Sequence, residues 1–198
     1  MVTKTENNRY RLGYRLATIG SIVTSRMEIT GIAHPYLVEF IGKGQRKRPT
    51  WQSWWMIRRS SLLIRSRGDS SIWMESSVGM TRKAHLTGTG KAQLAFCDEA
   101  QIESYIKNTE FSQMTRYTIK DEKELREELD RIRQQGYACD KEESEEGLVC
   151  FAAPVVNFKG KVVAAVSISG FRDKMYARQD EFIREIKETA RQISAELA

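Results

Sequence analysis

The chain has 198 residues, of which 40% are hydrophobic and 29% charged. This length and composition predict one domain with short attachments and enough apolar residues for a core. No apolar run approaches the roughly 20 residues that cross a bilayer, so we expect no membrane span, and the polar N-terminus predicts no signal peptide. Three cysteines without CxxC spacing, Cys97, Cys139 and Cys150, are typical of free thiols in a reducing cytoplasm.

The net charge of +6 is concentrated in one segment. Residues 41–68 contain eight basic and no acidic residues, together with three of the four tryptophans. The rest of the chain is therefore slightly acidic. This distribution indicates a mildly acidic protein with an unusual basic segment, and it argues against a generally basic nucleic-acid-binding protein.

The first third of the chain predicts two helices. We expect residues 1–9 to be mobile, whereas helical spacing of apolar residues follows from Leu12 to Met27 and again over about 30–40. Residues 41–68 show neither helical nor strand periodicity clearly. Residues 70–80 are typical of a strand and a turn.

Helices and one hairpin account for the remainder. We predict helices over 86–96, over 98–107 with Asp98 as its cap, and over 121–136 between Asp121 and Gly136. Residues 148–158 and 161–170 form two β-rich runs around a glycine turn, which predicts an antiparallel hairpin. An amphipathic helix from Phe182 to Leu197 closes the chain. Strands and helices do not alternate strictly, so the pattern favours an α+β fold with an antiparallel sheet covered by helices.

The glycine-rich run at 88–91 is not a phosphate-binding loop. That motif requires a glycine at position 85 and Ser or Thr at position 92, where this chain has His85 and Ala92. What remains is a helix entry whose backbone N–H groups are able to meet a small anion, or a tight loop that binds nothing.

Two kinds of chemistry are open but weakly supported. A thiol hydrolase needs Cys150 or Cys97 beside His85 or His34, although a cysteine in an apolar strand is more often a small hydrophobic residue. A zinc site formed by His85, Asp140 and Cys150 uses suitable ligand types at irregular spacing.

Ser167 and Ser169 carry more information because alternate residues of a strand share one face. If that face is inward, their hydroxyls form a donor pair suited to a carboxylate or carbonyl; if it is outward, they meet only water. Asp140 is the first residue of an acidic run that is typical of a solvated loop. The other acidic residues of the run are Glu142, Glu143, Glu145 and Glu146.

Five segments then occur in a characteristic order, at residues 9–13, 84–92, 136–143, 147–150 and 165–170. Together they resemble the effector-binding half of the IclR family of transcriptional regulators. The resemblance covers residues 9–40 and 69–198. It implies a GAF-like domain, an antiparallel sheet flanked by helices and preceded by a linker helix at 14–28, which senses a small organic acid.

The resemblance also implies a binding pocket. Backbone N–H groups of Gly88 and Thr89 are expected to meet the acid. Four side chains of the family's types are expected on the other side: Asp140, Cys150, Ser167 and Ser169. No cofactor and no enzymatic activity are implied.

The remaining implications concern assembly and DNA. Members of the family carry an N-terminal winged helix-turn-helix domain, and residues 1–13 resemble the end of its wing. We therefore expect operator DNA to be bound through a domain not seen in this chain, by a homodimer or tetramer without membrane contact. A sensor fragment and a gene that has lost its start, leaving an interaction module that does not bind DNA, are both compatible with this beginning.

Residues 41–68 depart from the family, which has two apolar strands around an acidic turn there. If Ser53 has a four-fold serine codon, reading codons that encode Thr50–Ile57 from the third base yields an apolar run followed by two aspartates. We expect that this segment is translated out of frame within the domain at 29–198. The rival interpretation is a genuine basic and aromatic patch that stacks bases or docks on an acidic surface.

Overall fold

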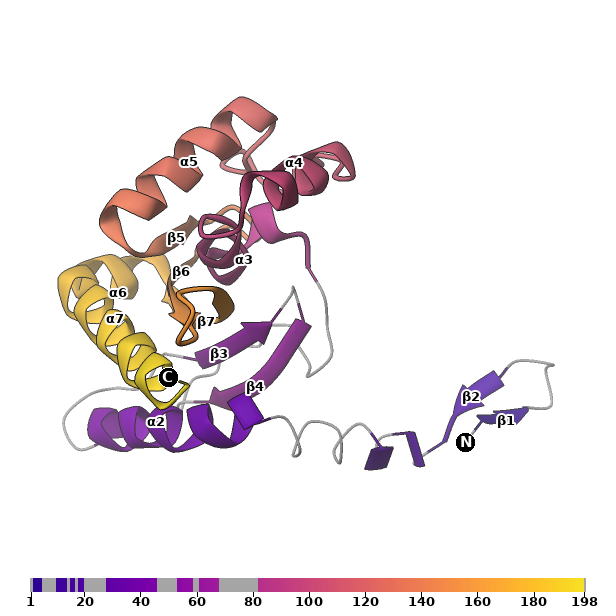
Figure 1. The fold of residues 1–198 in the computed structure, drawn as a ribbon, viewed down its shortest axis with the longest axis vertical. Coiled ribbons are helices and arrows are strands. Elements are labelled where there is room, and N and C mark those ends of the chain that lie inside the picture. Colours follow the sequence, from indigo (N-terminus) through magenta and orange to yellow (C-terminus); the bar gives the residue numbers. More distant parts are fainter. Residues whose placement is uncertain are drawn as a thin grey trace.

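A five-stranded antiparallel sheet forms the centre of the protein, as a computed structural model shows (Figure 1). The structure describes residues 2–4, 10–13, 15–16, 18–19, 28–45, 53–58, 61–67 and 82–197. Among these residues, no helix combines the length and the apolar character needed to cross a membrane.

The strand order is β4-β3-β7-β6-β5, and each neighbouring pair is antiparallel. The strands are β3 (Ser53–Arg58), β4 (Ser61–Arg67), β5 (Ala138–Lys141), β6 (Leu148–Val156) and β7 (Val162–Phe171). Strands β6 and β7 confirm the predicted hairpin, whose turn contains Gly160 at a φ of 69°. Together with the helices, this arrangement confirms the predicted α+β class.

One face of the sheet packs against helices from both ends of the chain. These helices are α2 (Glu28–Gln45), α6 (Arg172–Ala177) and α7 (Gln179–Glu196). Their apolar side chains meet those of the strands in a core that includes Leu37, Phe151, Ile168, Phe182 and Ile186, each at most 1% exposed. Burial of residues of this size contributes roughly 1.5–3 kcal/mol each.

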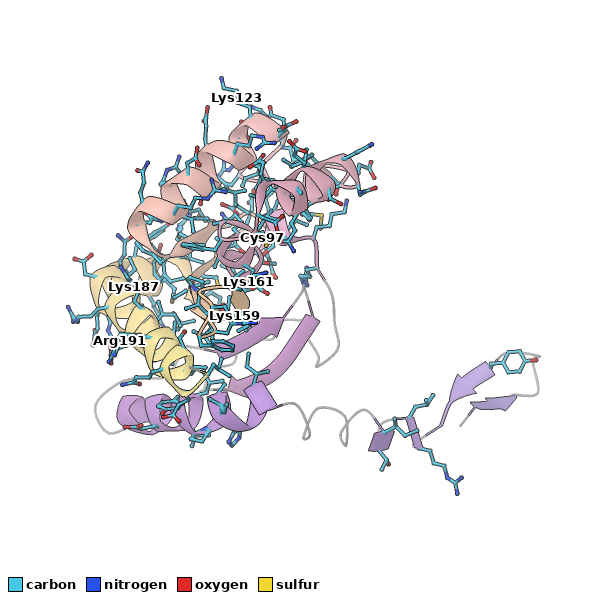
Figure 2. All side chains as sticks on the ribbon, viewed as in Figure 1. Cys97, Lys123, Lys159, Lys161, Lys187 and Arg191 are labelled. Carbon is cyan, nitrogen blue, oxygen red and sulfur yellow. The ribbon has the colours of Figure 1, made fainter. Side chains whose placement is uncertain are left out.

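The opposite face is covered by shorter elements, on the other side of the sheet from α7 (Figure 1). These are η1 (Ala84–Leu86), α3 (Gly88–Leu94), α4 (Glu99–Lys107) and α5 (Glu122–Gln135). The predicted caps are confirmed, because Asp98 accepts the Gln101 N–H, Asp121 accepts the Glu124 N–H, and Gly136 ends α5 with a φ of 76°. The outer face of α5 is exposed to solvent, and Figure 2 shows Lys123 projecting outward from it.

The first third of the chain departs most from the predictions. Residues 2–4, expected to be mobile, form β1 (Val2–Lys4), which pairs with β2 (Tyr10–Leu12), and residues 53–58 and 61–67 form strands that the sequence pattern did not predict. Helix α2 extends to Gln45, beyond the expected end near position 40. Of the predicted linker helix, positions 15–16, 18–19 and 28 are described, and they are helical, with Glu28 being the first residue of α2. The predicted strand and turn at 70–80 lie outside the described residues.

Candidate effector site

Strand register aligns three of the predicted site residues across the sheet. Asp140 of β5 pairs with Cys150 of β6, which pairs with Ser169 of β7. Directly paired residues of antiparallel strands point to the same face. An adjacent row on that face consists of Ala138, Ala152 and Ser167.

The two serines face inward. Ser167 is 1% exposed and Ser169 is 4% exposed, whereas their neighbours Val166 and Ile168 belong to the core on the α7 side. Of the two orientations that the sequence left open, the structure therefore shows the one in which the hydroxyls point toward α3. Ser169 and Ser167 both interact with the Cys150 side chain.

The start of α3 lies directly over these rows. A Cβ added at Gly88 would lie 3.1 Å from Cys150 Sγ and 3.5 Å from the backbone nitrogen of Asp140. The small side chains below Gly88 permit this close approach, and Thr89 is buried beside it. The structure thus brings the predicted residues of the helix start and of the three strands together.

The Cys150 thiol is a poor nucleophile in this environment. Burial raises its pKa to about 12, and the nearby Asp140 acts in the same direction, while the serine hydroxyls lower it slightly. Only the thiolate form is an effective nucleophile. Because the thiol stays protonated at neutral pH, Cys150 is a weak donor and packing group here, and thiol catalysis is not supported.

The carboxylate of Asp140 holds the loop that follows it. Its Oδ1 accepts the Glu143 N–H at 2.8 Å, and its Oδ2 accepts the Ser144 hydroxyl at 3.1 Å. Burial raises the pKa of Asp140, although Lys91 and these hydrogen bonds oppose the rise. Both oxygens of Asp140 therefore already have donors within the chain.

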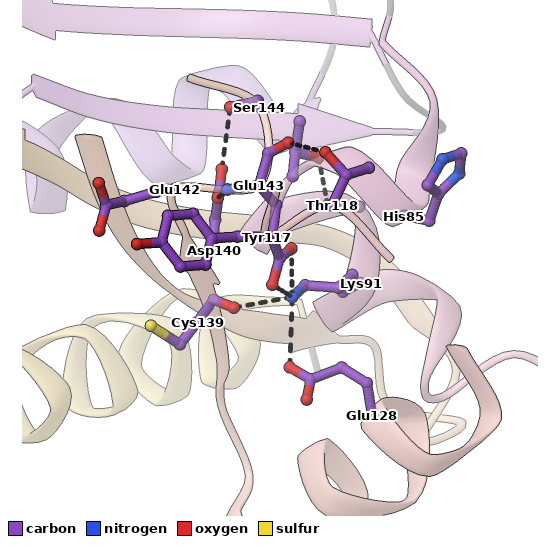
Figure 3. Close-up of polar contacts among 12 residues, drawn as sticks. His85, Lys91, Tyr117, Thr118, Glu128, Cys139, Asp140, Glu142, Glu143 and Ser144 are labelled. Atoms are coloured by element: carbon purple, nitrogen blue, oxygen red, sulfur yellow. Dashed lines mark hydrogen bonds and ion pairs between the residues drawn. The ribbon is translucent and has the colours of Figure 1, made fainter. Parts of the chain in front are cut away.

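A buried ion cluster lies next to Asp140, as Figure 3 shows. The Lys91 ammonium is fully buried and donates to Cys139 O at 2.7 Å, to Glu128 Oε1 at 3.2 Å and to the Glu143 carboxylate at 2.6 Å. Burial lowers the pKa of Lys91, but the facing carboxylates outweigh it, so the net shift is upward. Lys91 is thus charged and joins α3 to α5, to β5 and to the loop after β5.

This cluster corrects the prediction for the acidic run. Glu142 and Glu143 are buried, and only Glu145 and Glu146 behave as the expected solvated residues. The contact between Lys91 and Glu143 was not predictable from the sequence, because they are 52 residues apart and no local pattern relates them. The one available signal was a single lysine on a short helix whose other residues are uncharged.

His85 is buried away from the two rows of strand residues. Its Nδ1 lies 2.7 Å from the Tyr105 hydroxyl, and its ring centroid lies 4.9 Å from that of Phe111. Burial lowers the pKa of His85 to about 4, helped by the positive charges of Lys83 and Lys91. The imidazole is therefore neutral and packed among aromatic rings.

The zinc-site alternative is not supported. Within the part of the chain that the structure describes, no three His, Cys, Asp or Glu side chains are grouped so that they could hold a metal ion. His85, Asp140 and Cys150 are therefore not a ligand set. His34, the other histidine considered as a base, is exposed on α2.

Residues 22–195 match the model of the bacterial transcriptional regulator IclR C-terminal family. The chain belongs to the IclR family. It is 31% identical over 165 residues to the regulator XynR of Escherichia coli strain K12, and this match covers 83% of the chain and 64% of XynR. The chain thus spans less than two thirds of this curated relative.

Solved IclR-family structures show the same fold. The Thermotoga maritima IclR crystal structure matches 99% of this chain and 79% of its own, with 34% identity and a TM-score of 0.85. The inducer-binding domain of Acinetobacter PobR, solved as a double mutant with 3-hydroxybenzoic acid, matches 83% of this chain and 96% of its own. Its identity is 23% and its TM-score 0.70, so that likeness concerns the fold alone.

Proposed function

We propose that this chain is the effector-binding part of an IclR-type transcriptional regulator and that its effector is a small organic acid. The observation that carries this proposal is the in-register row of Asp140, Cys150 and Ser169 beneath Gly88. This is a binding arrangement rather than a reactive one, because the thiol it contains remains protonated. The family membership supports the same conclusion, and no enzymatic activity is proposed.

Hydrogen-bond donors at the site suit a carboxylate. The first N–H groups of a helix have no acceptor within the helix. The Thr87 side chain accepts from Gly90, which leaves the N–H groups of Gly88 and Thr89 as the donors that meet the acid. The hydroxyls of Ser167 and Ser169 donate from the opposite side, and Asp140 shapes the rim through its loop. The inducer-binding domain of PobR, which has a similar fold, was solved in complex with 3-hydroxybenzoic acid, and this supports an acid as the effector class.

The acid acts by shifting the arrangement of subunits. A ligand that binds one conformation better than another changes their populations and couples its site to a distant one. We propose that the chain forms a homodimer or tetramer in the cytoplasm. Operator DNA is then bound through a helix-turn-helix domain, and half-site spacing makes the affinity depend on subunit geometry.

Acid-induced thermal stabilisation tests the site. We expect at least one acid among pyruvate, lactate and 3-hydroxybenzoate to raise the melting temperature, because binding to the folded state alone stabilises it. The double variant Ser167→Ala and Ser169→Ala should lose this shift. Ser104→Ala, on the exposed side of α4, is the matched control and should keep it. An equal shift in the double variant would contradict the site, and no shift with any acid would contradict the proposed effector class.

We also propose that residues 41–68 derive from a shifted reading frame. Strands β3 and β4 lie in a segment that carries eight basic residues and no acidic one, whereas the rest of the chain is slightly acidic. If Ser53 has a four-fold serine codon, the alternative frame encodes an apolar run ending in an acidic turn at the same place. Resequencing the locus should reveal an interrupted frame, and one continuous frame would leave the basic and aromatic patch as the better interpretation.

A further inference from the structure

Lys91 connects the two halves of the proposed effector site. It follows Gly88 and Thr89 within the first turn of α3, and its Nζ reaches Cys139 O next to Asp140. A fully buried ammonium is held firmly by its partners, because separating it from them would leave a buried charge uncompensated at a large cost in free energy. The position of the α3 start relative to β5 therefore depends on Lys91 and on the carboxylates that hold it.

Glu143 connects Lys91 to Asp140. Its carboxylate contacts Lys91 Nζ at 2.6 Å, and its N–H donates to Asp140 Oδ1 at 2.8 Å. Its carbonyl oxygen accepts the Thr118 hydroxyl at 2.7 Å. With side chain, N–H and carbonyl all engaged, Glu143 transmits the position of Lys91 directly to the carboxylate of Asp140.

We propose that Lys91 and Glu143 are positioning residues for the effector site, and that Glu143 takes up a proton when a carboxylate binds there. This inference rests on the proposed function. It adds a regulatory property of the site, namely that acid binding depends on pH.

The charges around Glu143 explain why it is the group that responds. Lys91 of α3 faces it with a positive charge, while Glu128 of α5 and Asp140 of β5 face it with negative charges. Arg131 pairs with Glu128 from the outer surface of α5. Apart from that surface arginine, the Lys91 ammonium is therefore the positive charge that faces the three buried carboxylates of Glu128, Asp140 and Glu143.

An added anion raises the proton affinity of this cluster. Burial already raises the pKa of Glu143 to about 7; Lys91 opposes this shift, and Asp140 and Glu128 add to it. A bound carboxylate beside Asp140 acts in the same direction as Asp140, because like charges disfavour ionisation. The complex then holds more protons than the free protein near neutral pH. By linkage, acid binding tightens as the pH falls.

Calorimetric titration of the full chain between pH 6 and 8 measures this linkage. The probes are pyruvate and 3-hydroxybenzoate, which both remain ionised over this range. Uptake of one proton weakens affinity by at most about tenfold per pH unit as the pH rises. Repeating the titrations in two buffers of different ionisation enthalpy should show a fraction of a proton taken up per acid bound.

Isosteric variants separate titration from mere loss of structure. Glu143→Gln keeps a side chain that accepts a hydrogen bond from Lys91 but cannot ionise, so acid binding should become independent of pH, without proton uptake. Glu145→Gln removes an exposed carboxylate from the same acidic run and should keep the wild-type pH profile. Lys91→Met should weaken acid binding at every pH, and if it does not fold, Glu143→Gln still decides the question.

The outcomes are distinguishable. If an acid binds with the same affinity and no proton uptake across this range, or if Glu143→Gln retains the wild-type profile, this inference is overturned while the proposed function stands. If neither acid binds at any pH and the thermal test also fails, the proposed effector class and this inference fall together.

Discussion

The two faces of the sheet bury different kinds of side chain. On the α7 face, large apolar residues such as Phe151 and Phe182 pack together in the core. On the α3 face, small residues lie beside a buried lysine, a neutral histidine and buried carboxylates. The comparison indicates that the first face supplies stability, whereas the second keeps polar groups in fixed positions at the cost of desolvating them.

The α3 face should be the less tolerant of added volume, because its helix is packed closely against small groups. The variant Gly90→Ala would place a Cβ 2.4 Å from the carbonyl oxygen and 2.5 Å from the Cα of Ala84. Backbone atoms cannot rotate away, so we expect the largest loss here, with no cooperative unfolding transition by circular dichroism. Gly31→Ala in α2 has open space and should instead stabilise the helix by roughly 0.5–1 kcal/mol. A stable Gly90→Ala variant would show that α3 shifts easily.

Removing volume tests the α7 face. Phe151 is 1% exposed on the α7 side of β6, and Phe151→Ala should cost about 3–5 kcal/mol in urea unfolding because a cavity remains. Acid binding at a temperature where the variant is folded should be nearly unchanged, since Phe151 points away from the rows of Ser167 and Ser169. Loss of binding in a folded variant would mean that the two faces do not act separately.

Predictability also differed along the chain, according to how local the responsible interactions are. Caps such as Asp98 and Asp121 act within one turn, so their helices were predictable from neighbouring residues. Strands β3 and β4 were not, because their Arg-, Trp- and Ser-rich sequence lacks alternation and their order is set by pairing with β7. The four-residue strand β5 is too short for a periodic signal.

The candidate site followed the same division. The sequence alone left open whether Ser167 and Ser169 face inward, and only their burial beneath α3 decided it. Lys91 and Glu143 form a contact that exists only in three dimensions. The acidic run was misjudged because local composition does not reveal that a distant lysine neutralises one of its members.

The smallest expected effect is a pH dependence that only the α3 face should produce. The folded protein holds His85 neutral with its pKa lowered to about 4, whereas the ordinary value is 6.5. The unfolded chain therefore binds more protons between these values, and by linkage the stability contributed by neutral His85 is present above pH 6.5 and lost as the pH falls through 4. Glu143 has the opposite sign, since its raised pKa contributes stability that is lost as the pH rises from 4.5 through 7. The contribution of each group is the difference between the unfolding free energies of the wild type and of a variant lacking that group, followed as a function of pH.

We therefore expect the unfolding free energy of the wild type, relative to His85→Gln, to fall steadily from pH 6.5 to pH 4. Glutamine keeps an acceptor for the Tyr105 hydroxyl but does not titrate in this range. Ser104→Ala, on the exposed side of α4, removes no titratable group and is the control, so its difference curve should stay flat. A flat curve for His85→Gln as well would mean that His85 becomes protonated without unfolding, which requires solvent to reach the aromatic pocket formed with Phe111. The α3 face would then be open to water at His85. The two faces would differ in the types of residue they bury, but not in how well they exclude solvent.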